Sequence, residues 1–209
     1  MQKIKNIILD YGNVIFMIDF HRVRQAFISL GIKNVDIFFG HRVQDALFDG
    51  FDRGDISENE FREEIRQRSG NFALTDGEID EAWNTLLIGV PPGKHETLVY
   101  LKNKYRCFLL SNNNAIHYRY CMQHLQDVHN VADNSVFFEQ TFYSHLVGLR
   151  KPERAIFEEV INQTGLLPEE TLFIDDSPQH LKTAVALGFQ TALCTLDEPL
   201  ESLIRKFDL

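Results

Sequence analysis

Residues 4–13 of the chain read IKNIILDYGN, a β-branched and apolar run that stops at Asp10. A short run of this kind with a turn behind it is typical of a buried strand. In open parallel sheets, ligands bind beyond the carboxyl ends of the strands. Asp10, which directly follows the predicted strand, is therefore a candidate functional residue as well as a candidate turn residue.

Beyond the break at Pro91-Pro92-Gly93, predicted strands and helices alternate over short loops. Strands are expected at residues 106–110, 136–143, 171–174 and 190–194, each followed or preceded by a helical stretch. This alternation predicts an α/β fold, a Rossmann-like core of three layers in which a mostly parallel sheet has helices on both faces.

Between residues 17 and 91 the pattern is helical only. Helices are expected over residues 19–31, 41–51, 57–65 and 75–87, with Ser57 and Thr75 as the first residues of two capping boxes. The apolar residues of these helices, including Phe48, Phe51 and Trp83, are expected to form a helix–helix core. The chain is thus predicted to have a core at residues 1–16 and 92–209, interrupted by a helical-bundle cap at residues 17–91.

Composition excludes several classes of protein. Of 209 residues, 21 are Lys or Arg and 30 are Asp or Glu, which gives a net charge of −9 and argues against a nucleic-acid-binding surface. No run approaches ~18 apolar residues, so no membrane span or membrane partner is expected. The apolar run before Asp10 is too short for a signal peptide, and three cysteines without a CxxC pair fit a reducing cytosol. We expect a cytoplasmic protein that is a monomer or a weak homodimer.

Polar side chains follow three of the predicted strands. Asp10 follows the first strand, Ser111 and Asn112 end the second, and Asp175 with Asp176 ends a later one, while Lys151 begins a helix between the last two. Each group also has a plain structural interpretation, because strand-end carboxylates, serines and asparagines often only cap helices or form turns. His117, His124 and His129 are expected on the surface of one helical stretch.

The same set of side chains suits phosphoryl transfer. A carboxylate such as Asp10 can attack phosphorus and form an aspartyl-phosphate. Mg²⁺ is held by one or two carboxylates together with phosphate oxygens, and Asp10, Asp175 and Asp176 are the candidates. The Ser111 hydroxyl and the Lys151 ammonium can bind the remaining phosphate oxygens.

Four short motifs carry a resemblance to a known family. They are ILDYGNV at residues 8–14, LLSN at residues 109–112, the pair Lys151-Pro152, and FIDDS at residues 173–177. Over nearly its whole length the chain resembles the haloacid dehalogenase superfamily of hydrolases, in the subclass with a cap between motifs one and two. The forms of motifs one and four are most similar to the branch that contains alpha-D-glucose-1-phosphate phosphatase and the phosphatase domain of soluble epoxide hydrolases.

The resemblance implies a Mg²⁺-dependent phosphatase acting on a small phosphorylated metabolite. Asp10 would be the nucleophile, and the backbone carbonyl of Gly12 would join Asp10 and Asp176 as metal ligands, with Asp175 a further candidate. Ser111, Asn112, Lys151 and the Gly12 backbone would hold the substrate's phosphate.

One position departs from the family pattern. Phosphatases of this superfamily usually carry a second Asp two residues after the nucleophile, as a general acid and base, and this chain has Gly12 there. A substrate that leaves easily, such as a sugar 1-phosphate, would need this help least. His21 and His41 are the alternative proton donors if the cap brings them inward.

Two other functions stay open. A 2-haloacid dehalogenase also uses a strand-end Asp and lacks the second one, but it needs no metal, so the pair Asp175-Asp176 favours the phosphatase. The absence of an acid at Gly12 would also fit a weakly active or inactive family member that acts as an interaction protein.

Overall fold

A five-stranded sheet forms the centre of the computed structural model, which describes residues 3–33, 35, 39–40, 43–44 and 46–209. The strands lie in the order β7-β6-β1-β8-β9, and all neighbouring pairs are parallel. β1 is therefore central and covered on both faces, which is why it is apolar at successive positions. The strands are β1 Asn6–Leu9, β6 Arg106–Ser111, β7 Gln140–Tyr143, β8 Thr171–Asp175 and β9 Gln190–Leu193.

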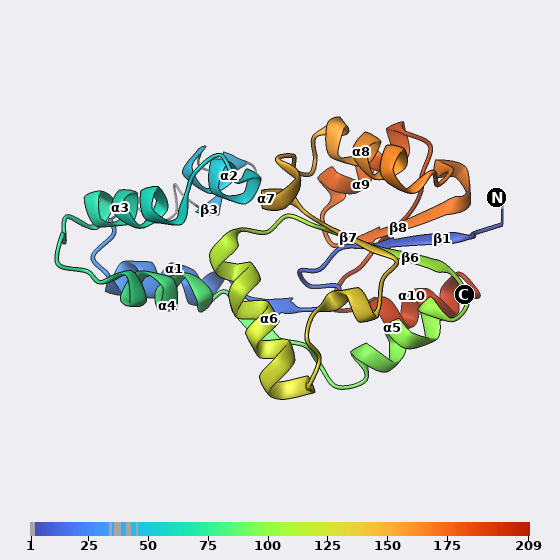
Figure 1. Cartoon of the computed structure of the whole chain (residues 1–209), viewed down its shortest axis with the longest axis horizontal. Coiled ribbons are helices and arrows are strands. Elements are labelled where there is room, and N and C mark those ends of the chain that lie inside the picture. The colour runs from blue at the N-terminus through green and yellow to red at the C-terminus, as the bar shows by residue number, and fades with distance from the viewer. Residues whose placement is uncertain (1–2, 34, 36–38, 41–42, 45) are drawn as a thin grey trace.

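Different helices cover the two faces of this sheet (Figure 1). Successive side chains of a strand point to opposite faces, so Ile7 and Leu9 pack into one apolar cluster and Ile8 packs into a second with Phe157. This arrangement confirms the predicted α/β core with three layers. One layer holds α8 Arg154–Thr164 and α9 Pro178–Ala186, and the other holds α5 Lys94–Lys102, α6 Ala115–His129 and α10 Leu200–Lys206.

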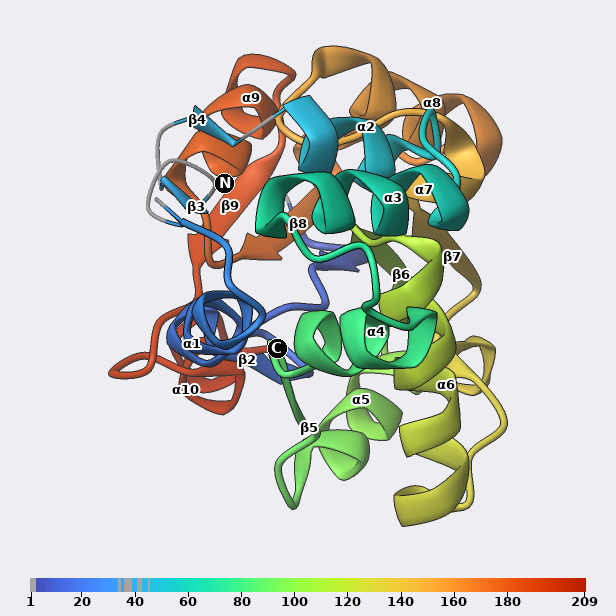
Figure 2. The ribbon, with the colours of Figure 1, turned by 90° about the vertical axis from the view of Figure 1, so that its left-hand side faces the viewer.

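Four helices lie beyond the carboxyl ends of the sheet strands and form what we call the helical insertion (Figures 1 and 2). Its two ends meet where β2 and β5 pair in antiparallel fashion, with Met17 opposite Gly89. Both predicted capping boxes are present, at Ser57 and Thr75. The elements are β2 Met17–Ile18, α1 Phe20–Ser29, α2 Ala46–Arg53, α3 Glu58–Ser69, α4 Asp76–Asn84 and β5 Leu87–Gly89.

Stacked aromatic rings form the interior of the helical insertion, as predicted. The Trp83 ring lies 5.1 Å from the Phe48 ring and 5.3 Å from the Phe61 ring, and the Phe51 and Phe61 rings stack at 4.3 Å. All four side chains are buried. Aromatic pairs at these separations add to the stability that burial alone provides.

Two predicted elements begin several residues later than expected. The helix expected from residue 41 begins at Ala46, because Val43–Gln44 (β4) instead pairs with Phe39–Gly40 (β3). His41 lies outside the described residues. The strand expected over residues 136–143 begins only at Gln140, because Asp133 caps a short 3-10 turn at Asn134–Val136.

A buried polar seam of four residues joins the helical insertion to the core. The Asn114 side-chain amide donates to Asp52 Oδ1 at 3.1 Å and lies 3.2 Å from His117 Nδ1. His117 Nε2 lies 3.1 Å from the carbonyl oxygen of Trp83, whose ring stacks on the imidazole at 4.5 Å. The expectation that His117 lies on the surface is wrong, because α4 covers this face of α6.

The seam fixes the charge of its histidine. Because Asn114 donates to Nδ1, the His117 proton resides on Nε2, from which it is donated to the Trp83 carbonyl. Burial lowers the pKa of His117 to about 4, so the ring is neutral at pH 7.

No helix in the described part of the chain is long and apolar enough to cross a bilayer.

Candidate functional site

The carboxyl ends of three neighbouring strands bring the predicted site residues together. Asp10 follows β1, Ser111 is the last residue of β6, and Asp175 is the last residue of β8. Because β6 and β8 flank β1 and run in its direction, these ends meet at one edge of the sheet. Lys151 reaches the same point from the loop between the short helix α7 (Ser144–Val147) and α8, and it is fully buried.

The Lys151 ammonium lies between two carboxylates. Its Nζ donates to Asp10 Oδ1 and to Asp175 Oδ2, both at 2.7 Å. Burial alone would lower the pKa of Lys151, but the two carboxylates outweigh it and raise the pKa. Lys151 is thus a permanent cation inside the protein.

A third carboxylate lies beside the two that Lys151 binds. Asp10, Asp175 and Asp176 each place an oxygen within 4.8 Å of the others. Burial raises the pKa of Asp10 to about 8, and the neighbouring carboxylates add to the effect although Lys151 opposes it. Burial likewise raises the pKa of Asp176. This excess of negative charge fits a divalent cation, since Mg²⁺ takes hard carboxylate oxygens.

Asp175 differs from the other two carboxylates. Burial would raise its pKa, but Lys151 and His180 outweigh burial and hold the pKa at about 2. Its Oδ1 accepts from the Ser177 backbone N–H at 2.8 Å. This carboxylate is ionised and fixed in place.

Two residues support the cluster without having been predicted to. The Asn13 amide donates to Asp176 Oδ2 at 2.9 Å, and its carbonyl accepts from the Ile18 N–H. Asn13 has φ 54°, a left-handed conformation that asparagine tolerates better than most residues. His180, in the first turn of α9, lies 2.9 Å from Asp175 Oδ1. Two features of the sequence could have identified them. Asn13 lies in the turn after β1, and His180 lies at the start of the helix that follows β8.

Ser111 and Asn112 occupy different positions. Both polar atoms of the Asn112 amide bind the backbone of Lys151, with the amide nitrogen donating to its carbonyl and the carbonyl accepting from its N–H, each at 2.8 Å. The Asn112 side chain therefore holds the loop that carries Lys151. Among the described residues, the buried Ser111 hydroxyl donates one hydrogen bond, of 3.3 Å, to the backbone carbonyl of Asn112.

The position of the absent acid is partly filled. A Cβ at Gly12 would lie 3.2 Å from the Ile18 Cδ1 atom, so a side chain there would require a small shift of the Ile18 side chain. His21 is exposed at the start of α1 and has no contact with the carboxylate cluster among the described residues. His41, the other expected donor, lies outside the described residues.

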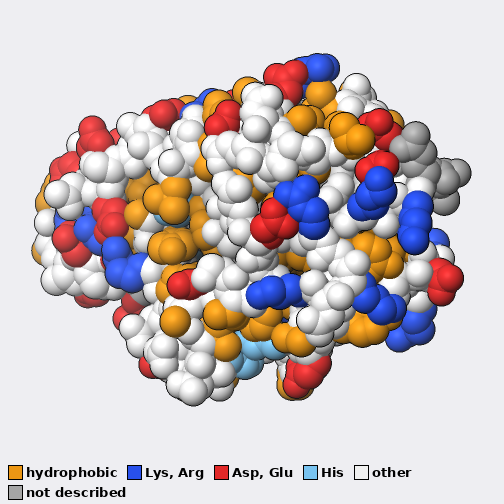
Figure 3. Space-filling view, turned by 45° about the vertical axis from the view of Figure 1, so that its right-hand side comes forward, with side chains coloured by type: hydrophobic (Ala, Val, Ile, Leu, Met, Phe, Trp, Pro, Cys, Tyr) orange, Lys and Arg blue, Asp and Glu red, His pale blue; other side chains and the backbone are white. Residues whose placement is uncertain are grey.

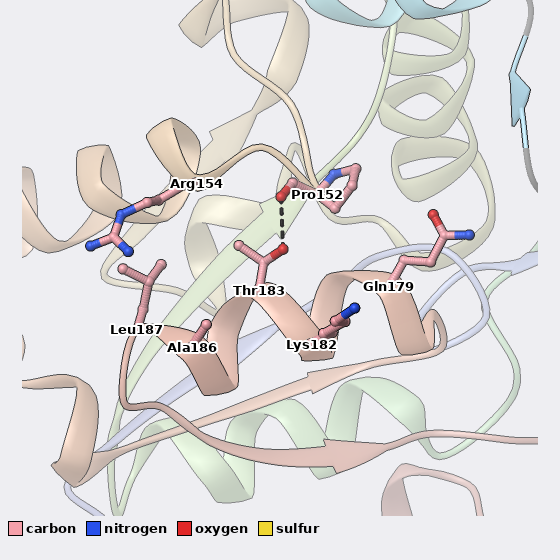
Figure 4. Close-up of a pocket in the computed structure, with 7 residues that line it drawn as sticks. All are labelled: Pro152, Arg154, Gln179, Lys182, Thr183, Ala186 and Leu187. Atoms are coloured by element: carbon pink, nitrogen blue, oxygen red, sulfur yellow. Dashed lines mark hydrogen bonds between the residues drawn. The ribbon is translucent and has the colours of Figure 1, made fainter.

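Two surface depressions lie apart from this cluster. One, of 430 Å³, runs along the outer side of α9 and includes Pro152, whose carbonyl accepts from the Thr183 hydroxyl at 2.9 Å (Figure 4). The other, of 630 Å³, lies at the amino ends of the strands, where Lys and Arg side chains gather (Figure 3). Its cations include Lys5 and Arg106, which are paired with Glu170 and Glu139.

Known proteins resemble this chain over most of its length. A D-ribitol-5-phosphate phosphatase from Bacteroides thetaiotaomicron is 31% identical over 189 residues, which cover 90% of each protein. A haloacid dehalogenase family enzyme from the same organism, solved as an aspartate-to-alanine variant in complex with magnesium and inorganic phosphate, is 33% identical with a TM-score of 0.88 and covers 97% of this chain and 99% of its own.

A haloacid dehalogenase-like hydrolase structure from Porphyromonas gingivalis is 29% identical with a TM-score of 0.85, covering 99% of this chain and 98% of its own. The family model for haloacid dehalogenase-like hydrolases matches residues 4–188. With four motifs in order, a parallel sheet and a strand-end carboxylate cluster, this chain belongs to the haloacid dehalogenase-like hydrolase family.

Proposed function

We propose that this protein is a Mg²⁺-dependent phosphatase that works through an aspartyl-phosphate on Asp10. The observation that carries the proposal is the cluster of three carboxylates, two of which share the buried Lys151 ammonium. Asp10, Asp176 and the Gly12 backbone carbonyl would hold the metal ion. When bound, Mg²⁺ supplies the positive charge that lets a carboxylate approach a phosphate dianion.

The residues of this chain account for both steps. Lys151 binds Asp10 Oδ1, while no described residue is hydrogen-bonded to Asp10 Oδ2, which we assign as the attacking atom. Its attack forms an O–P bond and breaks the bond from phosphorus to the substrate oxygen, which takes a proton from water and leaves as an alcohol. Water then cleaves the aspartyl-phosphate, releases inorganic phosphate and restores Asp10. Lys151 and Ser111 bind the phosphate oxygens in both steps, and Asn112 keeps Lys151 in place.

The helical insertion is proposed to act as the cap of this site. It lies beyond the carboxyl ends of the strands, where it can limit the size of substrate and keep water out (Figure 1). The buried polar seam fixes it to the core. The free and buried cysteines support a reducing, cytoplasmic location.

A small sugar phosphate or sugar-alcohol phosphate is the substrate class that we propose. The similar phosphatase from Bacteroides thetaiotaomicron is named for D-ribitol 5-phosphate. The missing acid at Gly12 instead favours a substrate with an easier leaving group, such as a sugar 1-phosphate. The expected likeness to glucose-1-phosphate phosphatases therefore stays a prediction beside this one. A panel of D-ribitol 5-phosphate, glucose 1-phosphate and glucose 6-phosphate separates these alternatives, and a faster reaction with glucose 6-phosphate than with glucose 1-phosphate would contradict the leaving-group argument.

The activity itself is tested by release of p-nitrophenol from p-nitrophenyl phosphate. We expect turnover with Mg²⁺, none with EDTA, and a loss of at least ~10³-fold in Asp10→Asn, because the nucleophile is removed. Turnover that survives either change would refute the proposal. No release of phosphate from any substrate, with chloride released from 2-chloropropionate, would favour the dehalogenase.

A further inference from the structure

His180 lies behind the carboxylate cluster, one step away from the reacting groups. It is the third residue of α9, and its Nδ1 is 2.9 Å from Asp175 Oδ1 and 3.1 Å from Asp175 Oδ2. A carboxylate only accepts hydrogen bonds, so Nδ1 must carry the proton and donate. Burial lowers the pKa of His180, in keeping with a neutral ring that has this one tautomer.

The Asp175 carboxylate is fully engaged by donors. Oδ1 accepts from His180 and from the Ser177 N–H, and Oδ2 accepts from Lys151. The side chain of Asp175 has no exposed surface. His180 and the Ser177 N–H together fix the direction of the carboxylate plane, so His180 shares in setting the direction of Oδ2 and with it the position of the Lys151 ammonium.

We propose that His180 is a positioning residue for phosphoryl transfer, which acts through Asp175 to hold the Lys151 ammonium beside the nucleophile. The inference rests on the proposed function. Without the His180 donor, only the Ser177 N–H holds Asp175 Oδ1, so the carboxylate plane can tilt and the second anchor of Lys151 is held less firmly. Outer partners that orient residues of a metal or catalytic site typically contribute ~10–100-fold to activity or affinity.

The position of α9 makes this link rigid. Its first turn carries His180, and the Thr183 hydroxyl on the next turn donates to the carbonyl of Pro152, the residue after Lys151 (Figure 4). One helix thus holds both the carboxylate that binds Lys151 and the main chain beside Lys151. A shift of the His180 side chain alone leaves the second contact intact, so a substitution there can be tested without loss of the helix.

Two substitutions separate the hydrogen bond from the shape of the side chain. Asparagine has an amide nitrogen one bond beyond Cγ, as far along the side chain as Nδ1 of histidine, so His180→Asn keeps a donor. Leucine has nearly the shape of asparagine but no donor, so the comparison of His180→Leu with His180→Asn isolates the hydrogen bond. Gln179→Leu is the control for an added leucine on this helix. Gln179 is exposed and lines the surface depression along the outer side of α9 (Figure 4).

The experiment measures kcat and KM for p-nitrophenyl phosphate with saturating Mg²⁺ in the full chain, together with the melting temperature. We expect kcat to fall ~10–100-fold in His180→Leu and to stay within ~3-fold of wild type in His180→Asn and Gln179→Leu. All three variants should unfold at a similar temperature. Equal activity in His180→Leu and wild type, or an equal loss in the asparagine and leucine variants, would overturn the inference.

Calorimetric binding of inorganic phosphate with Mg²⁺ gives a readout that needs no turnover. Phosphate should bind ~10-fold more weakly to His180→Leu than to His180→Asn, because Lys151 is displaced only in the former. A wild-type protein that binds phosphate but lacks activity contradicts the proposed function and leaves this comparison valid. A wild-type protein that neither reacts nor binds phosphate overturns both proposals.

Discussion

The carboxylate cluster and the buried polar seam both bring polar side chains together inside the protein, but they differ in charge. The cluster has more carboxylates than cations, whereas the histidine of the seam is neutral. At the cluster, three carboxylates lie together with one ammonium that binds two of them, and burial raises the pKa of Asp10 to about 8. At the seam, His117 is neutral and all its ring nitrogens have partners. A region built only for stability satisfies its polar groups internally, whereas the cluster needs a further cation. The difference points to the cluster as the place of chemistry.

The largest effect should come from removing the cation of the cluster. Lys151→Met keeps an unbranched apolar chain but leaves Asp10 and Asp175 without their shared partner. Loss of one partner of a buried ion pair typically costs ~3–5 kcal/mol, so we expect a fall of this size in the free energy of unfolding. Urea unfolding in EDTA at pH 7 measures it, with exposed Lys182→Met as the control. Equal stability of wild type and Lys151→Met would mean that the carboxylates are neutral without lysine.

Acid should act on the seam through His117. Its pKa is about 4 in the folded protein and near 6.5 when unfolded, so the unfolded chain binds the proton more tightly. The stability contributed by the neutral ring is complete above pH 6.5 and is lost as the pH falls toward 4, by up to ~3 kcal/mol. Urea unfolding at several pH values should show this slope in wild type and a smaller one in His117→Gln. Parallel pH profiles of the two proteins would contradict the assignment.

Mg²⁺ should stabilise the cluster and leave the seam unchanged. A ligand at 100 times its Kd adds about 2.7 kcal/mol to the free energy of unfolding. We expect a rise in melting temperature with Mg²⁺ in wild type and in His117→Gln, and a much smaller rise in Asp176→Asn. Thermal unfolding with and without EDTA measures the effect. A full rise in Asp176→Asn would place the ion elsewhere.

The smallest effect should come from the N-cap residue of α3, which belongs to neither region. Ser57 begins α3, where its hydroxyl accepts from the Glu60 N–H, so Ser57→Ala should cost ~1 kcal/mol of stability and leave activity unchanged. Chemical unfolding and the p-nitrophenyl phosphate assay test the two parts separately. A marked loss of activity would show that the helical insertion transmits local changes to the cluster.

Much of the fold is predictable from local sequence. The apolar run before Asp10, the alternation of strands and helices after residue 92, and the capping boxes at Ser57 and Thr75 all reflect periodicity and side-chain hydrogen bonds between near neighbours. The start of α2 at Ala46 was not predicted, because the strand pairing of Val43–Gln44 overrides the helical spacing.

The residues of the candidate site are also predictable from the sequence, whereas their arrangement is not. Asp10, Ser111, Asp175 and Asp176 are recognisable because strand ends in a parallel sheet meet at one edge, and Lys151 is recognisable from the pair Lys151-Pro152 before a helix. Their convergence is a property of the strand order, in which β1 lies between β6 and β8.

The sequence by itself determined the elements, the motifs and the residue types that reach the sheet edge, because these depend on contacts a few residues apart. Only the tertiary structure decided that Asn112 holds Lys151, that His180 holds Asp175 and that His117 is buried under Trp83. The partners in the first and last of these contacts are more than thirty residues apart, and the second depends on how α9 sits against β8. Hydrogen-bond partners of this kind are set by how helices pack on the sheet, which no local pattern records.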